Sequence, residues 1–181
     1  MLVRAEESVL VVVDVQDRLL PSIHESDRVL RNVDILLKAA AARPVPVIVT
    51  EQYAKGLGPT AAAVRDILPA GTPVVEKMTF ASTGEPAFND ALERTARRRI
   101  VLCGTEAHVC VLQTGLGLLA AGYRVHLVAD AVSSRTPANH TAAVDRLRAA
   151  GASIVTTEMV VFEWTERAGT PLFKTMLGLV R

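Results

Sequence analysis

Several features that would place a chain in a special class are scarce in this sequence. Only Cys103 and Cys110 are cysteines among 181 residues, too few for a disulfide framework, which predicts a cytoplasmic protein with free thiols. Aromatic residues make up 4%, and 20 basic side chains against 19 acidic ones leave a net charge of +1, so base stacking and attraction to nucleic acid or anionic lipid are disfavoured. No apolar run reaches the ~20 residues of a membrane span, and the N-terminus lacks a signal-peptide pattern. We expect neither a nucleic-acid nor a membrane partner.

What is present is the composition of an ordinary globular protein. Hydrophobic residues make up 50% and charged residues 22%, which excludes a disordered or fibrous chain. A chain of this length can bury roughly 70% of its unfolded surface, so it needs no disulfide bonds or structural metal to be stable. We find no linker, repeat or low-complexity segment, so we expect a single domain over residues 1–181.

Short β-branched runs alternate with longer helical patterns along the chain. Most runs are apolar throughout, as in strands that are covered on both faces. The expected strands are Val9–Asp14, Val45–Thr50, Pro73–Val75, Ile100–Cys103, Val125–Val128 and Ser153–Val155. Repeated strand–helix units predict an α/β protein with a three-layer α/β/α Rossmann-like fold and a six-stranded, mostly parallel sheet.

Three helices can be delimited from their end signals. Ser26 is the expected N-cap of the first, and the second runs from about Val109 to Ala121. In the third, Thr136 is the expected N-cap and Gly151 follows the end.

Three chemically active side chains fall at neighbouring strand ends, where ligands bind in parallel α/β sheets. Asp14 ends the first strand, Lys77 follows the third, and Cys110 opens the helix after the fourth. A thiol at a helix N-terminus beside a lysine is expected to have a lowered pKa, with Asp14 as its proton acceptor. Each residue alone also fits a structural role: Cys110 as a core residue, Asp14 as a helix cap and Lys77 as a solvated side chain. Only their joint placement favours a nucleophilic site. His108 is a weaker candidate base, because its position in the loop, two residues before Cys110, is expected to point its side chain away from the site.

Three sequence blocks, in this order and spacing, resemble the isochorismatase-like (cysteine hydrolase) superfamily. They are D-x-Q at 14–16, E-K-x-x-F at 76–80 and G-T-E-A-H-V-C-V at 104–111. That superfamily includes nicotinamidases and N-carbamoylsarcosine amidohydrolase. The resemblance extends to A-D-A-V-S-S-R at 129–135, and E-Q-Y-x-K-G-L-G-P-T at 51–60 looks like the isochorismatase-domain hydrolase branch. For this branch the resemblance implies a chemistry but no substrate.

The resemblance implies roles for individual residues. Cys110 matches the nucleophile, Asp14 the general base and Lys77 the third member of the catalytic set. A cis peptide bond is implied between Thr105 and Glu106, with the backbone N–H groups of Glu106 and Cys110 forming an oxyanion hole. The implied reaction is attack of the thiolate on a small amide or related C–N compound, followed by hydrolysis of a thioester.

Four further side chains lie on the loops nearest this set and are expected to line a pocket for a small-molecule substrate: Gln16, Gln52, Tyr53 and Phe80. Packing within the loops is an equally weighted alternative for each of them.

The chain departs from nicotinamidases in the loop after the second strand. Nicotinamidases bind a metal there through an aspartate and two histidines, whereas residues 50–60 offer only Glu51. A zinc site needs three or four ligands, so we predict no metal and no cofactor. Glu106 also stands where nicotinamidases have a small residue, which disfavours nicotinamide as the substrate.

Other functions remain as alternatives. One is the vinyl ether hydrolysis of true isochorismatases, which lack the nucleophilic cysteine. Another is a catalytically silent interaction domain of the same fold. A nucleotide-binding Rossmann module is disfavoured because the first strand is not followed by a glycine-rich turn.

The C-terminal region predicts self-association. The stretches Met159–Trp164 and Leu172–Val180 carry large apolar side chains that one small core would not cover. We therefore expect a homo-oligomer.

Overall fold

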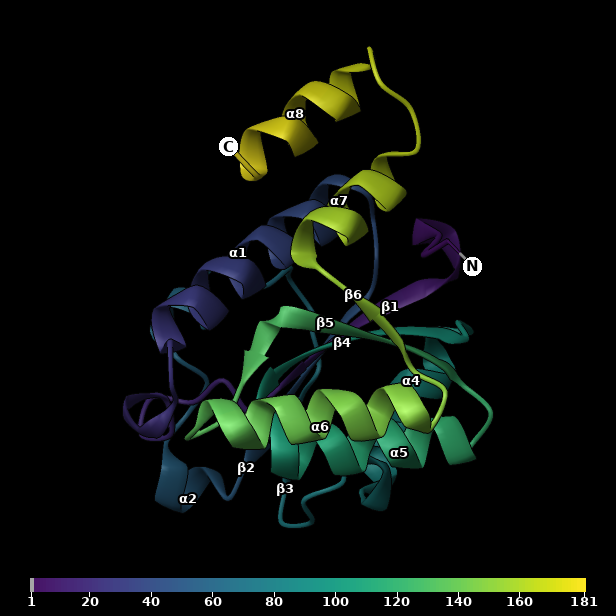
Figure 1. Ribbon diagram of the computed structural model, residues 1–181. Coiled ribbons are helices and arrows are strands. Elements are labelled where there is room, and N and C mark those ends of the chain that lie inside the picture. Colours follow the sequence, from purple (N-terminus) through teal and green to yellow (C-terminus); the bar gives the residue numbers. More distant parts are fainter. Residues whose placement is uncertain (1) are drawn as a thin grey trace.

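A six-stranded parallel sheet forms the centre of the molecule (Figure 1), with the strand order β3-β2-β1-β4-β5-β6. The computed structural model describes residues 2–181. Every neighbouring pair of strands is parallel. The strands are β1 (Ser8–Val13), β2 (Val47–Gln52), β3 (Val74–Lys77), β4 (Arg99–Thr105), β5 (Arg124–Ser133) and β6 (Ser153–Val155). The fold predicted from the strand–helix alternation is confirmed.

Helices cover both faces of this sheet. They are α1 (Ser26–Ala42), α2 (Ala54–Leu57), α3 (Ala62–Arg65), α4 (Pro86–Arg94), α5 (Leu112–Ala120), α6 (Pro137–Ala149), α7 (Thr157–Thr165) and α8 (Pro171–Leu179). A π-helical turn, Ala107–Val111, leads directly into α5. In Figure 1, α1, α7 and α8 lie on one side of the sheet and α4, α5 and α6 on the other.

The central strand β1 shows why its sequence is apolar throughout. All six of its residues are buried. Leu10 and Val12 join the core under α1 and α7, whereas Val9, Val11 and Val13 join the core under α4, α5 and α6. Successive side chains of a strand point to opposite faces, so a sheet covered on both faces needs apolar residues at every position.

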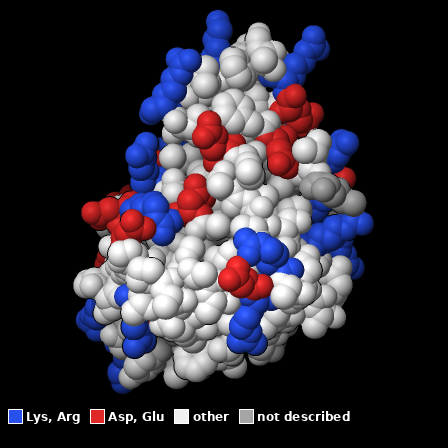
Figure 2. Space-filling view, viewed as in Figure 1, with Lys and Arg blue, Asp and Glu red and all other residues white. Residues whose placement is uncertain are grey.

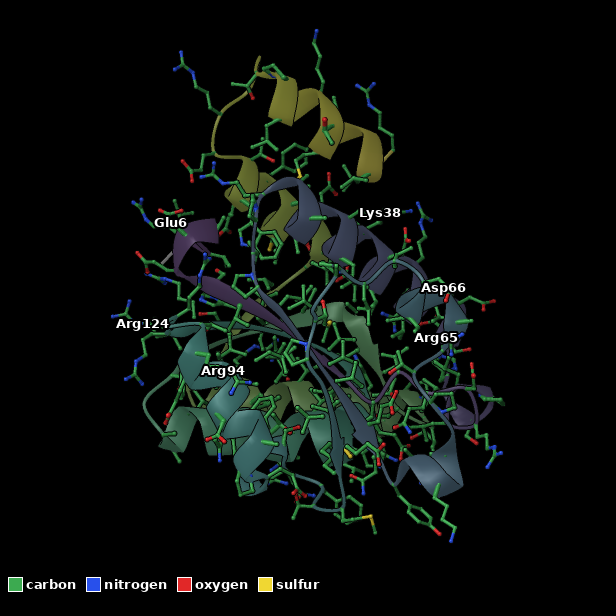
Figure 3. The ribbon with its side chains drawn as sticks, turned by 180° about the vertical axis from the view of Figure 1, so that it is seen from behind. Glu6, Lys38, Arg65, Asp66, Arg94 and Arg124 are labelled. Carbon is green, nitrogen blue, oxygen red and sulfur yellow. The ribbon has the colours of Figure 1, made fainter. Side chains whose placement is uncertain are left out.

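The carboxyl ends of the strands define one side of the molecule. Figure 3 shows Arg124, which begins β5, on one side, and Arg65 and Asp66, at the end of α3, on the other. The second of these sides is the carboxyl edge, where β1 and β4 end beside each other, with Val13 opposite Gly104.

Gly104 allows β1 and β4 to approach closely at this edge. Its φ is +114°, and a Cβ atom there would lie 2.0 Å from the carbonyl oxygen of Val13. Only glycine tolerates both conditions, so this position keeps the ends of β1 and β4 together.

Two of the predicted helix starts need correction. α1 begins at Ser26 itself, and its N-cap is Glu25, whose φ of +51° is left-handed and whose carboxylate pairs with Arg28 at 2.9 Å. The helix expected from Val109 begins earlier, as the π-helical turn. Thr136 is the N-cap of α6 as predicted, since its side chain accepts a hydrogen bond from the N–H of Asn139.

Part of the apolar C-terminal region is covered by the chain itself, which weakens the reason given for self-association. Trp164, Val160, Val161 and Met176 are fully buried, because α7 and α8 pack on α1. Most other apolar side chains of Leu172–Val180 are half-buried, and Met159 is a large apolar side chain that is 51% exposed. In the described part of the chain, no helix is long and apolar enough to cross a membrane.

Candidate active site

Asp14 and Lys77 form a buried ion pair at the carboxyl edge of the sheet. The Lys77 Nζ lies 2.8 Å from Asp14 Oδ2, and both side chains are 0% exposed. The hydroxyl of Thr50, at the equivalent height of β2, donates to Asp14 Oδ1 at 2.6 Å. Asp14 directly follows β1, and its φ of +50° ends the extended conformation of the strand at this residue. A buried charge of this kind requires its counter-ion, because either partner alone would be uncompensated.

Lys77 is held in place by three further oxygen atoms. Its Nζ donates to Gln52 Oε1 at 2.6 Å and to the carbonyl oxygens of Phe80 and Thr79 at 3.2 and 3.3 Å. Gln52 and Lys77 are register partners at the ends of β2 and β3, which explains why their side chains meet. The loop after β3 therefore folds back over the ammonium group.

Cys110 lies in the π-helical turn and is 5% exposed. Its Sγ lies 3.9 Å from Gln52 Oε1. Burial, together with the negative charge of Asp14, raises the pKa of the Cys110 thiol to about 12, and the positive charge of Lys77 offsets this only in part. The lowered pKa expected from the helix N-terminus is therefore wrong. Desolvation of the thiolate at this buried position outweighs the effect of the nearby cation on the pKa.

Cys103 has no part in this arrangement. It is fully buried in β4, and its Sγ donates to the carbonyl oxygen of Val11 at 3.7 Å. Burial raises the pKa of this thiol as well. Cys103 is a core residue, as expected.

The segment before Cys110 is tied to Asp14. The peptide bond between Thr105 and Glu106 is cis, at the position that the family resemblance implies. The hydroxyl of Thr105 donates to the carbonyl oxygen of Asp14 at 2.7 Å. The backbone of this segment thus lies against the end of β1.

The N–H groups of the π-helical turn are used unevenly. Val109 and Val111 donate to the carbonyl oxygen of Glu106 at 3.1 and 3.2 Å, and His108 donates to a serine hydroxyl at 3.3 Å. Backbone N–H groups at the start of a helix suit an anionic ligand.

Gln16 and Gln52 both bond within the protein through their amide groups, but to different partners. Gln16 is fully buried; its Oε1 accepts from the Gln52 N–H at 2.8 Å, and its Nε2 donates to the carbonyl oxygens of Gln52 at 3.0 Å and Gly58 at 2.6 Å. This bonding favours a role in bracing the loop after β2 over the predicted contact with substrate. Gln52 instead places its side-chain oxygen between Lys77 and Cys110.

Tyr53 and Phe80 lie near the surface beside this set. They are 48% and 52% exposed, in the loops that follow Gln52 at the end of β2 and Lys77 at the end of β3. Tyr53, Lys77 and Met78 line a surface cavity of about 350 Å³. The sequence thus brings its pocket candidates to one side of the molecule, two inside it and two at its surface.

Several contacts of the site were missed from sequence. Thr50 gives no signal, because a threonine within an apolar strand looks like an ordinary strand residue. His108 turns toward α6: its Nδ1 lies 2.9 Å from the hydroxyl of Ser134, and its Nε2 lies 3.4 Å from Asn139 Nδ2. Arg135 pairs with Glu106 through two nitrogens. Both Ser134 and Arg135 lie in the block at 129–135, to which no role was assigned.

The carboxylate of Glu51, the acidic residue considered as a metal ligand, is bonded to Thr60 at the end of the following loop. Glu51 Oε1 accepts from both the N–H and the hydroxyl of Thr60 at 2.6 Å. Among the described residues, no group of three or more histidine, cysteine, aspartate or glutamate side chains is placed to hold a metal ion. The absence of a metal in the working protein stays a prediction.

Charges of both signs are distributed over the surface. Figure 2 shows basic and acidic side chains interspersed on the face it displays, with uncharged surface between them.

Comparison with known sequences identifies the family. The model of the isochorismatase domain matches residues 8–159. The secreted isochorismatase effector Isc1 of Phytophthora sojae is 38% identical over 177 residues, which cover 96% of this chain and 84% of that protein. Human isochorismatase domain-containing protein 2 is 35% identical over 175 residues, covering 96% of this chain and 83% of that protein.

Solved structures agree with this assignment. A Caenorhabditis elegans protein described as MAR1 ribonuclease superposes with a TM-score of 0.94 at 34% identity, over 99% of this chain and 92% of that one. The Escherichia coli YcaC gene product, described as an octameric hydrolase of unknown specificity, superposes with a TM-score of 0.93 at 23% identity over 99% and 89% of the two chains, which shows the shared fold. The chain therefore belongs to the isochorismatase-domain family and has its hydrolase fold.

Proposed function

We propose that this protein is a cysteine-dependent hydrolase of a small amide or related C–N bond, with a thioester intermediate. The observation that carries the proposal is the fully buried Asp14–Lys77 ion pair beside the Cys110 thiol. Buried ion pairs add little to the stability of a folded protein, so stability alone does not explain this pair. A carboxylate beside a thiol can instead act as the base that activates the nucleophile.

The raised pKa of Cys110 assigns the first step to a general base. The thiol is protonated at neutral pH, so Asp14 takes the Sγ proton as sulfur attacks the acyl carbon. The S–C bond forms, and the carbonyl electron pair moves to oxygen. The N–H groups of Glu106 and Cys110 donate to this oxyanion in the proposal, as the family resemblance implies.

Collapse of the intermediate completes the first half of the reaction. The C–N bond breaks, and the leaving nitrogen takes the proton from Asp14, which releases ammonia or an amine. Water then attacks the thioester and gives a proton to Asp14. The acid leaves, and the proton returns to sulfur, which restores the resting thiol.

The solvent exposure of the side chains near the site suggests which of them contact the substrate. Tyr53 and Phe80 are half-exposed beside the site, and we propose that they contact the substrate. Gln52 orients Lys77 and the thiol. The prediction for Gln16 is weakened by its bonds to the loop backbone.

A screen of small amides, carbamoyl compounds and anilides tests this proposal, with released ammonia or amine as the readout. Turnover should vanish in Cys110→Ser, because a serine hydroxyl is far harder to ionise than a thiol. It should survive in Cys103→Ser, the matched control at the second cysteine. Amide turnover that persists in Cys110→Ser would refute the assigned nucleophile.

Two other activities belong in the same screen. Isc1 is described as an isochorismatase at 38% identity, which favours vinyl ether hydrolysis of isochorismate as the second candidate. Cleavage of isochorismate that Cys110→Ser retains would favour this candidate. The C. elegans neighbour is described as a ribonuclease, so RNA is also included, although a net charge of +1 gives little attraction for it.

Self-association and location also remain proposals. Four of the exposed large apolar side chains cluster around β2, β3 and the adjoining loops: Tyr53, Val74, Met78 and Phe80. This cluster, beside an edge strand, supports a homo-oligomer better than the C-terminal segments do. A cytoplasmic location rests on the free thiols, whereas the Phytophthora relative is described as secreted.

A further inference from the structure

The block at 129–135 ends in two residues that hold the segment before Cys110. Arg135 binds the carboxylate of Glu106 with two nitrogens, Nε at 2.9 Å from Oε2 and Nη2 at 3.1 Å from Oε1. The Glu106 side chain is 7% exposed, whereas that of Arg135 is 64% exposed. A nearly buried carboxylate thus has its counter-ion supplied from the surface.

Ser134 provides a second attachment two residues further along the same segment. Its hydroxyl is fully buried, accepts from the His108 N–H at 3.3 Å and lies 2.9 Å from His108 Nδ1. The carbonyl oxygen of Ser134 in turn accepts from the His24 N–H at 2.9 Å. The backbone on both sides of Ala107 is therefore fixed to the loop between β5 and α6.

We infer that Arg135, supported by Ser134, is a positioning residue that holds the Glu106 N–H where it can donate to the oxyanion of the reaction. A two-nitrogen contact fixes both the distance and the orientation of a carboxylate. Without Arg135, the unpaired carboxylate of Glu106 would turn toward water and draw its backbone with it. The inference rests on the proposed function, because it concerns the same oxyanion.

Arg135 acts on the oxyanion and leaves the thiol unchanged. The largest influences on the pKa of Cys110 are its burial, Asp14 and Lys77. Loss of Arg135 should therefore weaken binding of a tetrahedral adduct while the ionisation of the thiol stays the same. A merely structural role would not separate these two effects.

The test uses two probes that need no knowledge of the substrate. Iodoacetamide alkylates Cys110, and mass spectrometry distinguishes it from Cys103. Propionaldehyde adds reversibly to the thiol: an S–C bond forms, the electron pair of the C=O π bond moves to oxygen to give an alkoxide, and Asp14 takes the thiol proton. The aldehyde concentration that halves alkylation measures the stability of the adduct in the oxyanion hole. Arg135→Gln is compared with Arg135→Lys and with Arg148→Gln, an exchange of an exposed arginine on α6 that pairs with Asp145.

In Arg135→Gln, about tenfold more propionaldehyde should be needed for half protection, with the pH profile of alkylation unchanged. Arg135→Lys should be intermediate, because lysine offers a point charge without the two-nitrogen geometry. Arg148→Gln should match the unchanged protein. Because lysine retains the positive charge, Arg135→Lys still tests the inference if Arg135→Gln impairs folding.

Equal protection in Arg135→Gln and the unchanged protein would overturn the inference, as would alkylation that slows in parallel with the loss of protection. If Cys110 of the unchanged protein reacts but the aldehyde gives no protection, the oxyanion hole is wrongly assigned and the inference falls, while the nucleophile stands. If Cys110 does not react at all, the proposed function falls and takes the inference with it.

Discussion

At the scale of single residues, the site is a set of charges whose separate effects oppose one another. Asp14 raises the pKa of Cys110 and Lys77 lowers it, yet the two form one ion pair at 2.8 Å. Changing either residue should therefore move the ionisation of the thiol and the rate of the reaction in ways that a simple loss of folding cannot mimic.

Asp14→Asn should separate thiol ionisation from turnover. Asparagine cannot accept a proton, so amide hydrolysis should fall by about 10²–10⁴. Removal of the negative charge should also lower the pKa of Cys110, because the carboxylate raises it in the unchanged protein. Alkylation by iodoacetamide measured against pH should shift to lower pH as turnover is lost. An unshifted profile would contradict the assigned contact between Asp14 and the thiol.

Lys77→Met should act in the opposite sense on the thiol. The pKa of Cys110 should rise, since Lys77 is the cation that lowers it, and alkylation at a given pH should slow. The buried Asp14 would also lose its counter-ion, which costs about 3–5 kcal/mol when one partner of a buried pair is removed. Urea unfolding measures this cost, with Lys38→Met on α1, half-exposed and paired with Asp34, as the control. Equal stability of the two variants would argue against a charged pair.

At the scale of elements, the ends of β1 and β4 bring Asp14 and the segment before Cys110 together. Gly104 makes this possible, because its positive φ and its closeness to Val13 exclude a side chain. The registers of β4 and β5 also shift between Leu102 and Gly104, so β5 bends beside the site, just before the loop that carries Arg135.

Gly104→Ala should destabilise the protein by at least about 2 kcal/mol, because strained φ adds to a clash with backbone that cannot move aside. The matched control is Gly122→Ala, where φ is +81° but no atom lies within 4 Å of the added Cβ. This control should cost about 1 kcal/mol from strain alone. Denaturant unfolding curves compare the two, and equal costs would show that the close approach of β1 and β4 is relaxed in solution.

His126 on β5 makes stability depend on pH. Its ring is buried with neither nitrogen hydrogen-bonded, and burial, with the positive charge of Arg99, lowers its pKa from 6.5 to about 4. Above pH 6.5 the ring is neutral in both the folded and the unfolded chain. As the pH falls from 6.5 to 4, the unfolded chain takes up the proton first, so stability should decrease across this window.

His126→Phe should flatten this part of the profile of unfolding free energy against pH, while His24→Gln, an exchange of an exposed histidine, should leave it unchanged. A slope in His126→Phe equal to that of the unchanged protein would assign the pH dependence to other groups.

At the scale of the whole molecule, the exposed apolar side chains around β2 and β3 concern self-association. Val74, at the start of the edge strand β3, is 45% exposed, and Met78, which follows β3 near the site, is 70% exposed. A surface of this kind is stable when a second copy covers it.

Light scattering at micromolar concentration should therefore give a mass above the 19.4 kDa of one chain. Val74→Lys combined with Met78→Lys should shift the protein toward this monomer mass. Met159→Lys is the control, because Met159 is similarly exposed but lies on α7, away from β3. A monomer in all samples, or dissociation caused by Met159→Lys alone, would refute the predicted interface.

Residue pattern and chain order were enough to predict the sheet and the location of the candidate site. Apolar runs such as the one before Asp14 mark strands covered on both faces, and the rule that parallel strands present their carboxyl ends together brought Asp14, Lys77 and Cys110 to one edge. These inferences need only local pattern and chain order.

The ionisation and solvent exposure of those residues could not be predicted in this way, because both depend on how the elements pack. The helix N-terminus predicted an acidic thiol at Cys110, but burial raised its pKa. Arg135, far from Glu106 in the chain, became its counter-ion, and Trp164 was covered by the chain's own helices. Ionisation and coverage depend on which distant side chains exclude water from a group, and that is fixed only when the elements pack.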